Sequence, residues 1–98
     1  MNNKNVYLSK IELDDQVSEL VDVLIKINDK DTCKYLLDDL CTYKEVEQMA
    51  QRVVSARLLI EGCTYEEVIE KTGISSATLS RVSKCVKYGK GYNSIIKK

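Results

Sequence analysis

The chain has 98 residues, enough for one domain, and its 31% charged and 44% apolar residues are ordinary for a globular protein. It has no histidine, which excludes Ser–His–Asp and Cys–His catalysis and metal sites that use histidine. Fifteen basic and fifteen acidic side chains balance overall, but residues 71–98 hold seven bases and no acid, which suggests that this end meets a polyanion.

The absence of proline and the long amphipathic stretches predict an all-α fold. The first helix is expected at about residues 9–28, where apolar side chains recur at steps of three and four. They are Leu13, Val17, Leu20, Leu24 and Ile27, and Val21 and Ile25 widen the stripe. Such a broadly apolar helix suggests a dimerisation element, although packing within the chain would also explain it, and both can hold together.

Two further helices are expected at about 33–41 and 43–61. Asp31-Thr32 is the predicted cap of the first, which would turn Tyr35, Leu36, Leu37 and Leu40 inward. The second begins at the capping box Thr42-x-x-Glu45, in which hydroxyl and carboxylate satisfy free backbone N–H groups, and ends at Gly62. Its apolar stripe consists of Val46, Ala50, Val53, Ala56 and Ile60.

A second capping box, Thr64-x-x-Glu67, opens a short helix at about 65–72 that Gly73 ends. A further helix at about 76–88 is ended by Gly89 and Gly91, and a C-terminal turn at 92–98 is expected to turn Ile95 and Ile96 inward. Residues 1–98 are therefore interpreted as a single domain. Dimerisation helices occupy about 9–62, and a helix-turn-helix occupies 64–88.

The helix-turn-helix prediction depends on Tyr65 to Lys84, YEEVIEKTGISSATLSRVSK. Gly73 permits a left-handed turn, Ile74 fills the corner, and Leu79 and Val82 anchor the second helix. A helical hairpin that only packs would show the same apolar spacing, so these positions alone do not decide between the two.

The second helix of the pair is basic and free of acids, which favours DNA binding. Small residues at its start let the backbone approach base edges, and its Arg and Lys can neutralise phosphate or contact guanine. The residues of this segment expected to bind DNA are Ser75, Ser76, Ala77, Thr78, Ser80, Arg81, Lys84 and Lys87.

The segments DDLCT, AQR, EGCTYEEVIEKTGISSATLSRV and YGKGY resemble the Trp-repressor superfamily, and in particular its YerC/YecD-like branch. The resemblance covers about Leu36 to Ile96. It implies an intertwined, all-helical homodimer with a DNA-reading head on each side, which binds operator DNA and represses transcription. By position it implies base contacts from Ser76, Ala77 and Ser80, and places Tyr65 and Glu66 near the DNA backbone.

The Trp repressor needs L-tryptophan beside its recognition helix, and the resemblance places that effector pocket at Gln51, Arg52, Arg81, Val82 and Cys85. One pocket arginine matches Arg81, whereas the other falls at Gln51, next to Arg52. Val82 replaces the pocket glycine, and its branched side chain in the space of the indole ring would cost on the order of 1–3 kcal/mol. We therefore expect no tight tryptophan binding. Whether the protein responds to a different small-molecule effector is left open by the sequence.

The first functional hypothesis is therefore a homodimeric transcriptional regulator whose partner is double-stranded DNA. The alternative is a helical, dimeric protein-interaction module without DNA readout, which the acidic first helices and Glu66 motivate. An enzyme is disfavoured because no paired carboxylates form a recognisable pocket pattern, and we expect neither a cofactor nor a metal.

The four cysteines include no C-x-x-C pair and are interpreted as small buried apolar residues rather than disulfides. No apolar run approaches the roughly 20 residues that a membrane span needs. The N-terminus also lacks the pattern of a secretory signal, so the expected location is the cytoplasm.

Overall fold

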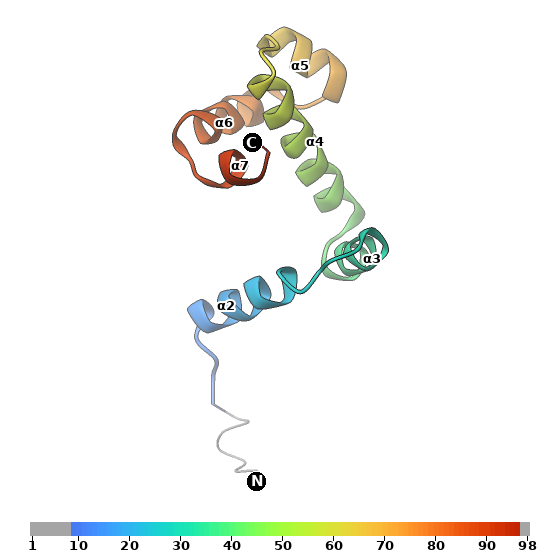
Figure 1. The fold of residues 1–98 in the computed structure, drawn as a ribbon, viewed down its shortest axis with the longest axis vertical. Helices are drawn as coiled ribbons and strands as arrows, with labels where there is room; N and C mark the ends of the chain where they lie inside the picture. The colour runs from blue at the N-terminus through green and yellow to red at the C-terminus, as the bar shows by residue number, and fades with distance from the viewer. Residues whose placement is uncertain (1–8, 97–98) are drawn as a thin grey trace. The chain divides into compact units, whose positions relative to one another are not determined.

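The computed structural model describes residues 9–96 and is all-α, which confirms the predicted fold class (Figure 1). Residues 9–96 contain no strand. Their helices are α2 (Leu13–Leu24), α3 (Lys30–Leu40), α4 (Tyr43–Ile60), α5 (Tyr65–Thr72), α6 (Ser76–Tyr88) and α7 (Gly91–Ile95). The chain forms two compact units, residues 1–36 and 37–98, which divide within α3 and are described separately. The assignment of residues 1–98 to a single domain stays a prediction.

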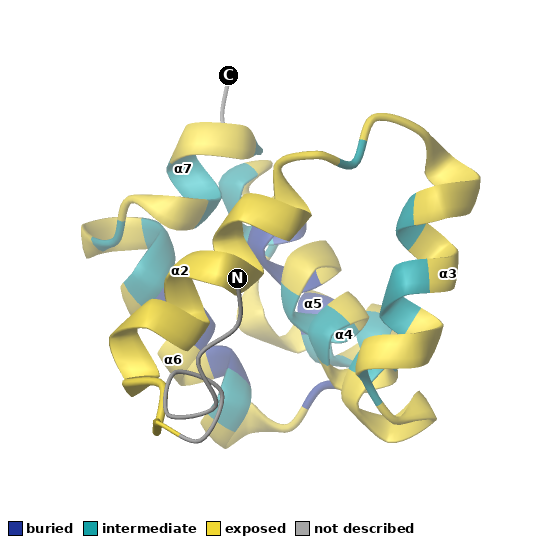
Figure 2. Cartoon of the chain, turned by 90° about the horizontal axis from the view of Figure 1, so that it is seen from below, coloured by how far each residue is buried: buried dark blue, intermediate teal, exposed yellow. Residues whose placement is uncertain are grey.

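The N-terminal unit contains α2 and the first part of α3. Helix α2 is shorter than predicted, and none of its residues is buried, so it is exposed throughout (Figure 2). Helix α3 begins at Lys30 and not at 33, because the Asp29 carboxylate accepts a hydrogen bond from the backbone N–H of Thr32 at 2.9 Å. The cap predicted at Asp31-Thr32 was therefore wrong. Tyr35, expected to face inward, is 68% exposed.

The core of the C-terminal unit lies where α4 packs against α5 and α6, and α7 packs on α6. Buried residues lie on α4, α5 and α6 and on the turn before α6 (Figure 2). The core residues are Ala56, Leu58, Val68, Ile74, Leu79 and Val82. Of the stripe predicted along α4, Ala56 alone is buried, because α5 and α6 cover only the C-terminal half of that helix. Val53 is 50% exposed, and Leu40, also expected inward, is exposed as well.

Side-chain caps explain where α4, α5 and α6 begin. Both predicted capping boxes are confirmed; in the second, the backbone N–H of Thr64 donates to Glu67 Oε1 at 2.8 Å and that of Glu67 donates to Thr64 Oγ1 at 3.2 Å. These hydrogen bonds from Thr64 hold the pKa of the Glu67 carboxyl below its usual value. Helix α6 is capped differently, since Ser75 Oγ accepts from the Thr78 backbone N–H at 3.2 Å and position 78 carries no carboxylate.

The C-terminal segment folds back onto the end of α6. The Asn93 side chain donates from Nδ2 to the backbone oxygens of Val86 at 2.8 Å and Gly89 at 3.0 Å. Helix α7 begins at Gly91, one residue before the predicted turn, and residues 97–98 of that turn lie outside the described residues. Ile96 packs against the core as expected, whereas Ile95 is 75% exposed.

All four cysteines carry free thiols and are half-buried. Within residues 9–96, no helix is long and apolar enough to cross a membrane, and no cluster of three or more metal-ligating side chains is found.

Candidate nucleic-acid interface

One flank of α6 is exposed and carries small, polar and basic side chains. Leu79, Val82 and Ser83 are buried on the other side of the helix and fix its rotation on the core. The exposed side chains of this flank are Ser76, Ala77, Ser80, Arg81, Lys84 and Lys87. Tyr65 is partly exposed at the first position of α5. The flank therefore presents a helix N-terminus followed by three cations.

The turn between α5 and α6 is held on α4 by Thr72, a residue that the sequence did not single out. Thr72 Oγ1 donates to the Val68 carbonyl at 2.8 Å and accepts from the Ile74 backbone N–H at 3.1 Å. From α4, Gln51 Nε2 donates to the Thr72 carbonyl at 3.2 Å, and the fully buried Ser55 places Oγ 3.5 Å from Thr72 Oγ1. We call these four hydrogen bonds the Thr72 network. Gly73 then takes the left-handed backbone that was predicted, with φ of 77°.

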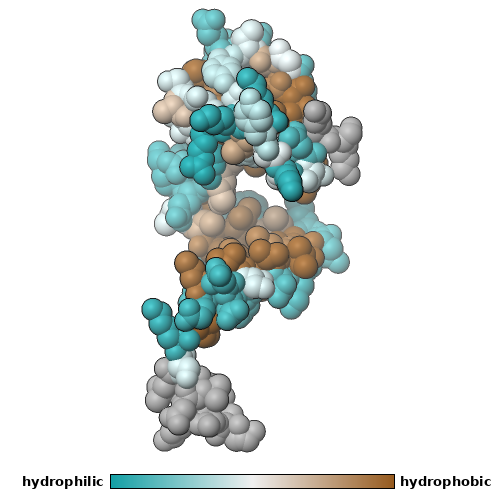
Figure 3. Space-filling model, turned by 90° about the vertical axis from the view of Figure 1, so that its left-hand side faces the viewer, coloured by the Kyte–Doolittle hydropathy of each residue, from teal (hydrophilic) through white to brown (hydrophobic). Residues whose placement is uncertain are grey.

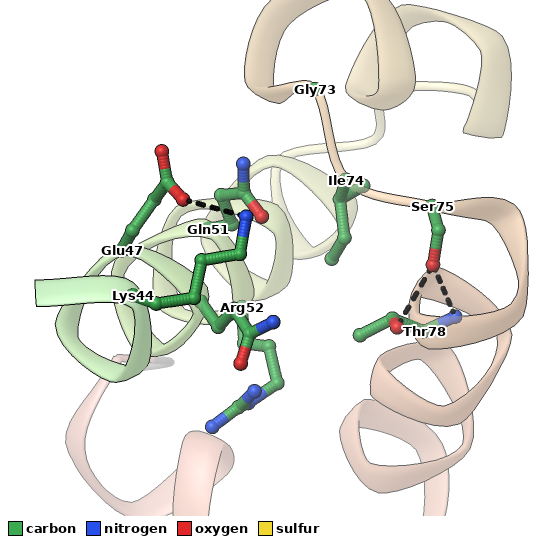
Figure 4. A pocket seen from close by; sticks show the side chains of 9 residues that line it. Lys44, Glu47, Gln51, Arg52, Gly73, Ile74, Ser75 and Thr78 are labelled. Atoms are coloured by element: carbon green, nitrogen blue, oxygen red, sulfur yellow. Dashed lines mark hydrogen bonds and ion pairs between the residues drawn. The ribbon is translucent and has the colours of Figure 1, made fainter. Parts of the chain in front are cut away.

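A polar hollow of about 320 Å³ lies between α4 and the start of α6 (Figure 4). Its lining is Lys44, Glu47, Gln48, Gln51, Arg52, Gly73, Ile74, Ser75 and Thr78. Lys44 Nζ lies 3.4 Å from Glu47 Oε1 in an exposed ion pair. Arg52 is half-buried and forms no ion pair within residues 9–96. Lys44 and Gln48 were not predicted as site residues, because they precede α6 by about thirty positions and only the fold brings them near it.

The five positions of the expected effector pocket are not gathered around one hollow. Gln51 and Arg52 line the polar hollow, whereas Cys85 lines a separate apolar hollow beside α7. Val82 is 1% exposed and belongs to the core, and Arg81 is exposed on α6. Gln51 Nε2 donates its hydrogen bond to the Thr72 carbonyl and so helps to hold the turn between α5 and α6.

Comparison with known proteins gives a consistent result. The sequence model of the Trp repressor protein family matches residues 15–98. The uncharacterised protein YerC of Bacillus subtilis (strain 168) is 40% identical over 74 residues, which cover 76% of this chain and 71% of YerC. The crystal structure of a candidate Trp repressor from Staphylococcus aureus superposes with a TM-score of 0.80 at 28% identity, over 98% of this chain and 93% of that one. The chain therefore belongs to the Trp repressor family, in its YerC-like branch.

Proposed function

We propose that this protein is a homodimeric transcriptional repressor of the cytoplasm that reads operator DNA with α6. The observation that carries the proposal is the exposed flank of α6, with small residues at its start, three cations beyond them and no acid after residue 70. A helix of 13 residues is about 20 Å long, and the major groove of B-DNA, about 12 Å wide, admits an α-helix.

Each part of the flank has a distinct role in this proposal. Ser76 and Ala77 bring the first turn of α6 to the base edges, where the unpaired N–H groups of a helix start also favour phosphate. Arg81 and Lys84 contact guanine or phosphate farther along the groove, and Lys87 contacts phosphate. Tyr65 contacts the DNA backbone from the start of α5.

The dimer is proposed from the apolar surface that the N-terminal unit exposes. Helix α2 buries none of its residues, although several of them are large and apolar. The exposed fractions of Leu13, Val17, Leu20 and Val21 are 40–71%. Figure 3 shows a group of hydrophobic side chains at the height at which Figure 1 shows α2. Contiguous apolar surface of this kind marks an interaction site, and membership of the Trp repressor family supports a second copy of the chain as its occupant. A two-fold dimer would present its two α6 helices to half-sites about 34 Å apart.

DNA binding is tested with the double variant Arg81→Gln, Lys84→Gln, measured by fluorescence anisotropy on genomic fragments selected by the wild-type protein. We expect the salt dependence of log K to fall by roughly 0.9 for each lost phosphate contact. The matched control is Lys30→Gln with Arg57→Gln, which removes two charges outside the flank. Equal affinity and salt slope in both double variants would show that α6 does not dock as proposed. If no fragment is selected at low salt, the protein-interaction module is the better hypothesis.

Dimerisation is tested by light scattering of Leu20→Glu, with Ser18→Glu as the control that adds the same charge to the same helix. We expect Leu20→Glu to be a monomer and Ser18→Glu to remain a dimer. Two dimeric variants, or a monomeric wild-type protein, would contradict the proposed interface.

Tryptophan is not required in this proposal, because Val82 lies in the core and Gln51 is hydrogen-bonded to the turn. Calorimetric titration of the wild-type protein with L-tryptophan should give no micromolar binding. Micromolar binding would show instead that the pocket opens for the indole ring.

A further inference from the structure

We infer that Tyr88, the last residue of α6, binds a backbone phosphate of DNA through its phenol hydroxyl. The inference rests on the proposed function, because it adds a neutral contact to the same interface. Tyr88 is 82% exposed, although tyrosine is on average a partly buried residue. Within residues 9–96 its ring does not pack against the core and its hydroxyl has no hydrogen-bond partner. The fold of the described chain therefore leaves this side chain without a role.

Tyr88 lies on the line of α6 that faces directly away from the core. The exposed residues on this line are Ala77, Arg81, Lys84 and Tyr88, at steps of four, three and four. Residues with this spacing share one face of a helix, and the buried residues of α6 lie on the opposite face. A surface that contacts Arg81 and Lys84 from outside is therefore also in a position to contact Tyr88.

The length of α6 places Tyr88 near the rim of the groove. At about 1.5 Å per residue, Tyr88 lies about 16 Å along the helix axis from Ala77, whose turn meets the base edges in the proposed complex. The major groove is about 12 Å wide, so a helix that crosses it from the base edges has its last turn at the sugar–phosphate backbone. Tyrosine side chains are among the groups that bind phosphate oxygens.

The end of α6 is a fixed support for this side chain. Asn93 Nδ2 donates to the carbonyls of Val86 and Gly89, one before and one after Tyr88 in the chain, and the Gly89 N–H donates to the Cys85 carbonyl at 2.8 Å. A group on an ordered backbone loses less entropy when it binds. Residues 71–98 contain no acid, so no carboxylate of this segment repels a phosphate at Tyr88.

The test uses the fact that tyrosine carries no charge. A neutral contact releases no counterion, so its loss weakens binding without changing the salt slope, whereas Lys84→Gln should lower that slope by about 0.9. Affinity is measured by anisotropy at several salt concentrations, on selected and on random DNA. For Tyr88→Phe, which removes the hydroxyl alone, we expect about fivefold weaker binding to both DNAs, an unchanged slope and an unchanged Tm.

Two further variants complete the comparison. Tyr88→Lys replaces the neutral donor with a cation, so it should keep most of the affinity and steepen the salt slope by about 0.9. Tyr35→Phe is the matched control, because it removes the hydroxyl of an exposed tyrosine outside α6, and it should bind DNA like the wild type.

Nitration by tetranitromethane, located by peptide mass spectrometry, gives a measurement on the unsubstituted protein. We expect bound DNA to slow the nitration of Tyr88 and to leave the rate at Tyr35 unchanged. Wild-type affinity of Tyr88→Phe together with an unprotected Tyr88 overturns the inference, and the proposed function stands if the Arg81, Lys84 double variant still loses affinity. If the wild-type protein binds no DNA, both fail. Slow nitration without DNA that becomes fast in Leu20→Glu would place the ring against a second copy and would also overturn the inference.

Discussion

Thr72→Val tests whether the Thr72 network holds the turn between α5 and α6. Valine keeps the shape of threonine but removes the hydroxyl, so the Ile74 N–H and the Ser55 hydroxyl lose their acceptor. An unsatisfied buried polar group costs about 1–3 kcal/mol. The Ile74 residue is 3% exposed, so its N–H should bear most of this cost, while the Ser55 contact is long at 3.5 Å. We expect a loss of about 2 kcal/mol in the free energy of unfolding.

The assay is thermal unfolding followed by far-UV circular dichroism, at one protein concentration because the Tm of the proposed dimer would depend on concentration. A loss of this size corresponds to a Tm lower by roughly 10 °C for a domain of this length. Thr72→Ser is the control, because it keeps the hydroxyl and removes only a methyl group. DNA affinity should fall for Thr72→Val as well, since the turn sets the direction of α6.

Equal stability of Thr72→Val and Thr72→Ser would refute this reasoning. The turn would then be positioned by the burial of Ile74 and by the left-handed Gly73 alone. A stability loss without any loss of DNA affinity would refute the part that links the network to α6.

Local geometry predicts the effects of three further substitutions. The pKa of the Glu67 carboxyl is lowered in the folded protein, so its capping hydrogen bonds stabilise the fold at pH values above the ordinary carboxyl pKa. This stabilisation is lost as the pH falls through the lowered pKa. Acid unfolding of Glu67→Gln should therefore show a free energy of unfolding that depends less on pH in that window. Asn93→Asp should destabilise more than Asn93→Ala in urea titrations, because a carboxylate would face the carbonyls of Val86 and Gly89; the reverse order would contradict the assigned hydrogen bonds. Gly89→Ala should lower Tm strongly, since its Cβ would lie 2.7 Å from the Cys85 carbonyl oxygen, whereas Gly91→Ala meets nothing within 4 Å and should not.

The sequence predicted well those features that neighbouring residues determine. The capping boxes at Thr42 and Thr64 and the left-handed turn at Gly73 each depend on a few adjacent residues, and the structure confirms all three. The start of α3 was wrong although it is equally local, because Asp29 and Asp31 were both plausible caps and the spacing did not choose between them.

Features that depend on distant partners were less predictable. An amphipathic stripe shows which side chains are apolar but not what covers them, so Val53 and Leu40 were expected inside and are exposed. Thr72 and Ser55 were overlooked because a hydroxyl within an apolar pattern carries no signal until its partners are placed. Lys44 was missed for the same reason, since the fold alone brings it beside α6.

The cap of α6 leaves a trade-off at a single position. A glutamate in place of Thr78 would complete a third capping box with Ser75 and strengthen the helix. The same carboxylate would stand at the mouth of the polar hollow and repel a polyanion. If the proposed function holds, selection for heat resistance alone would therefore favour a more stable protein that binds DNA more weakly.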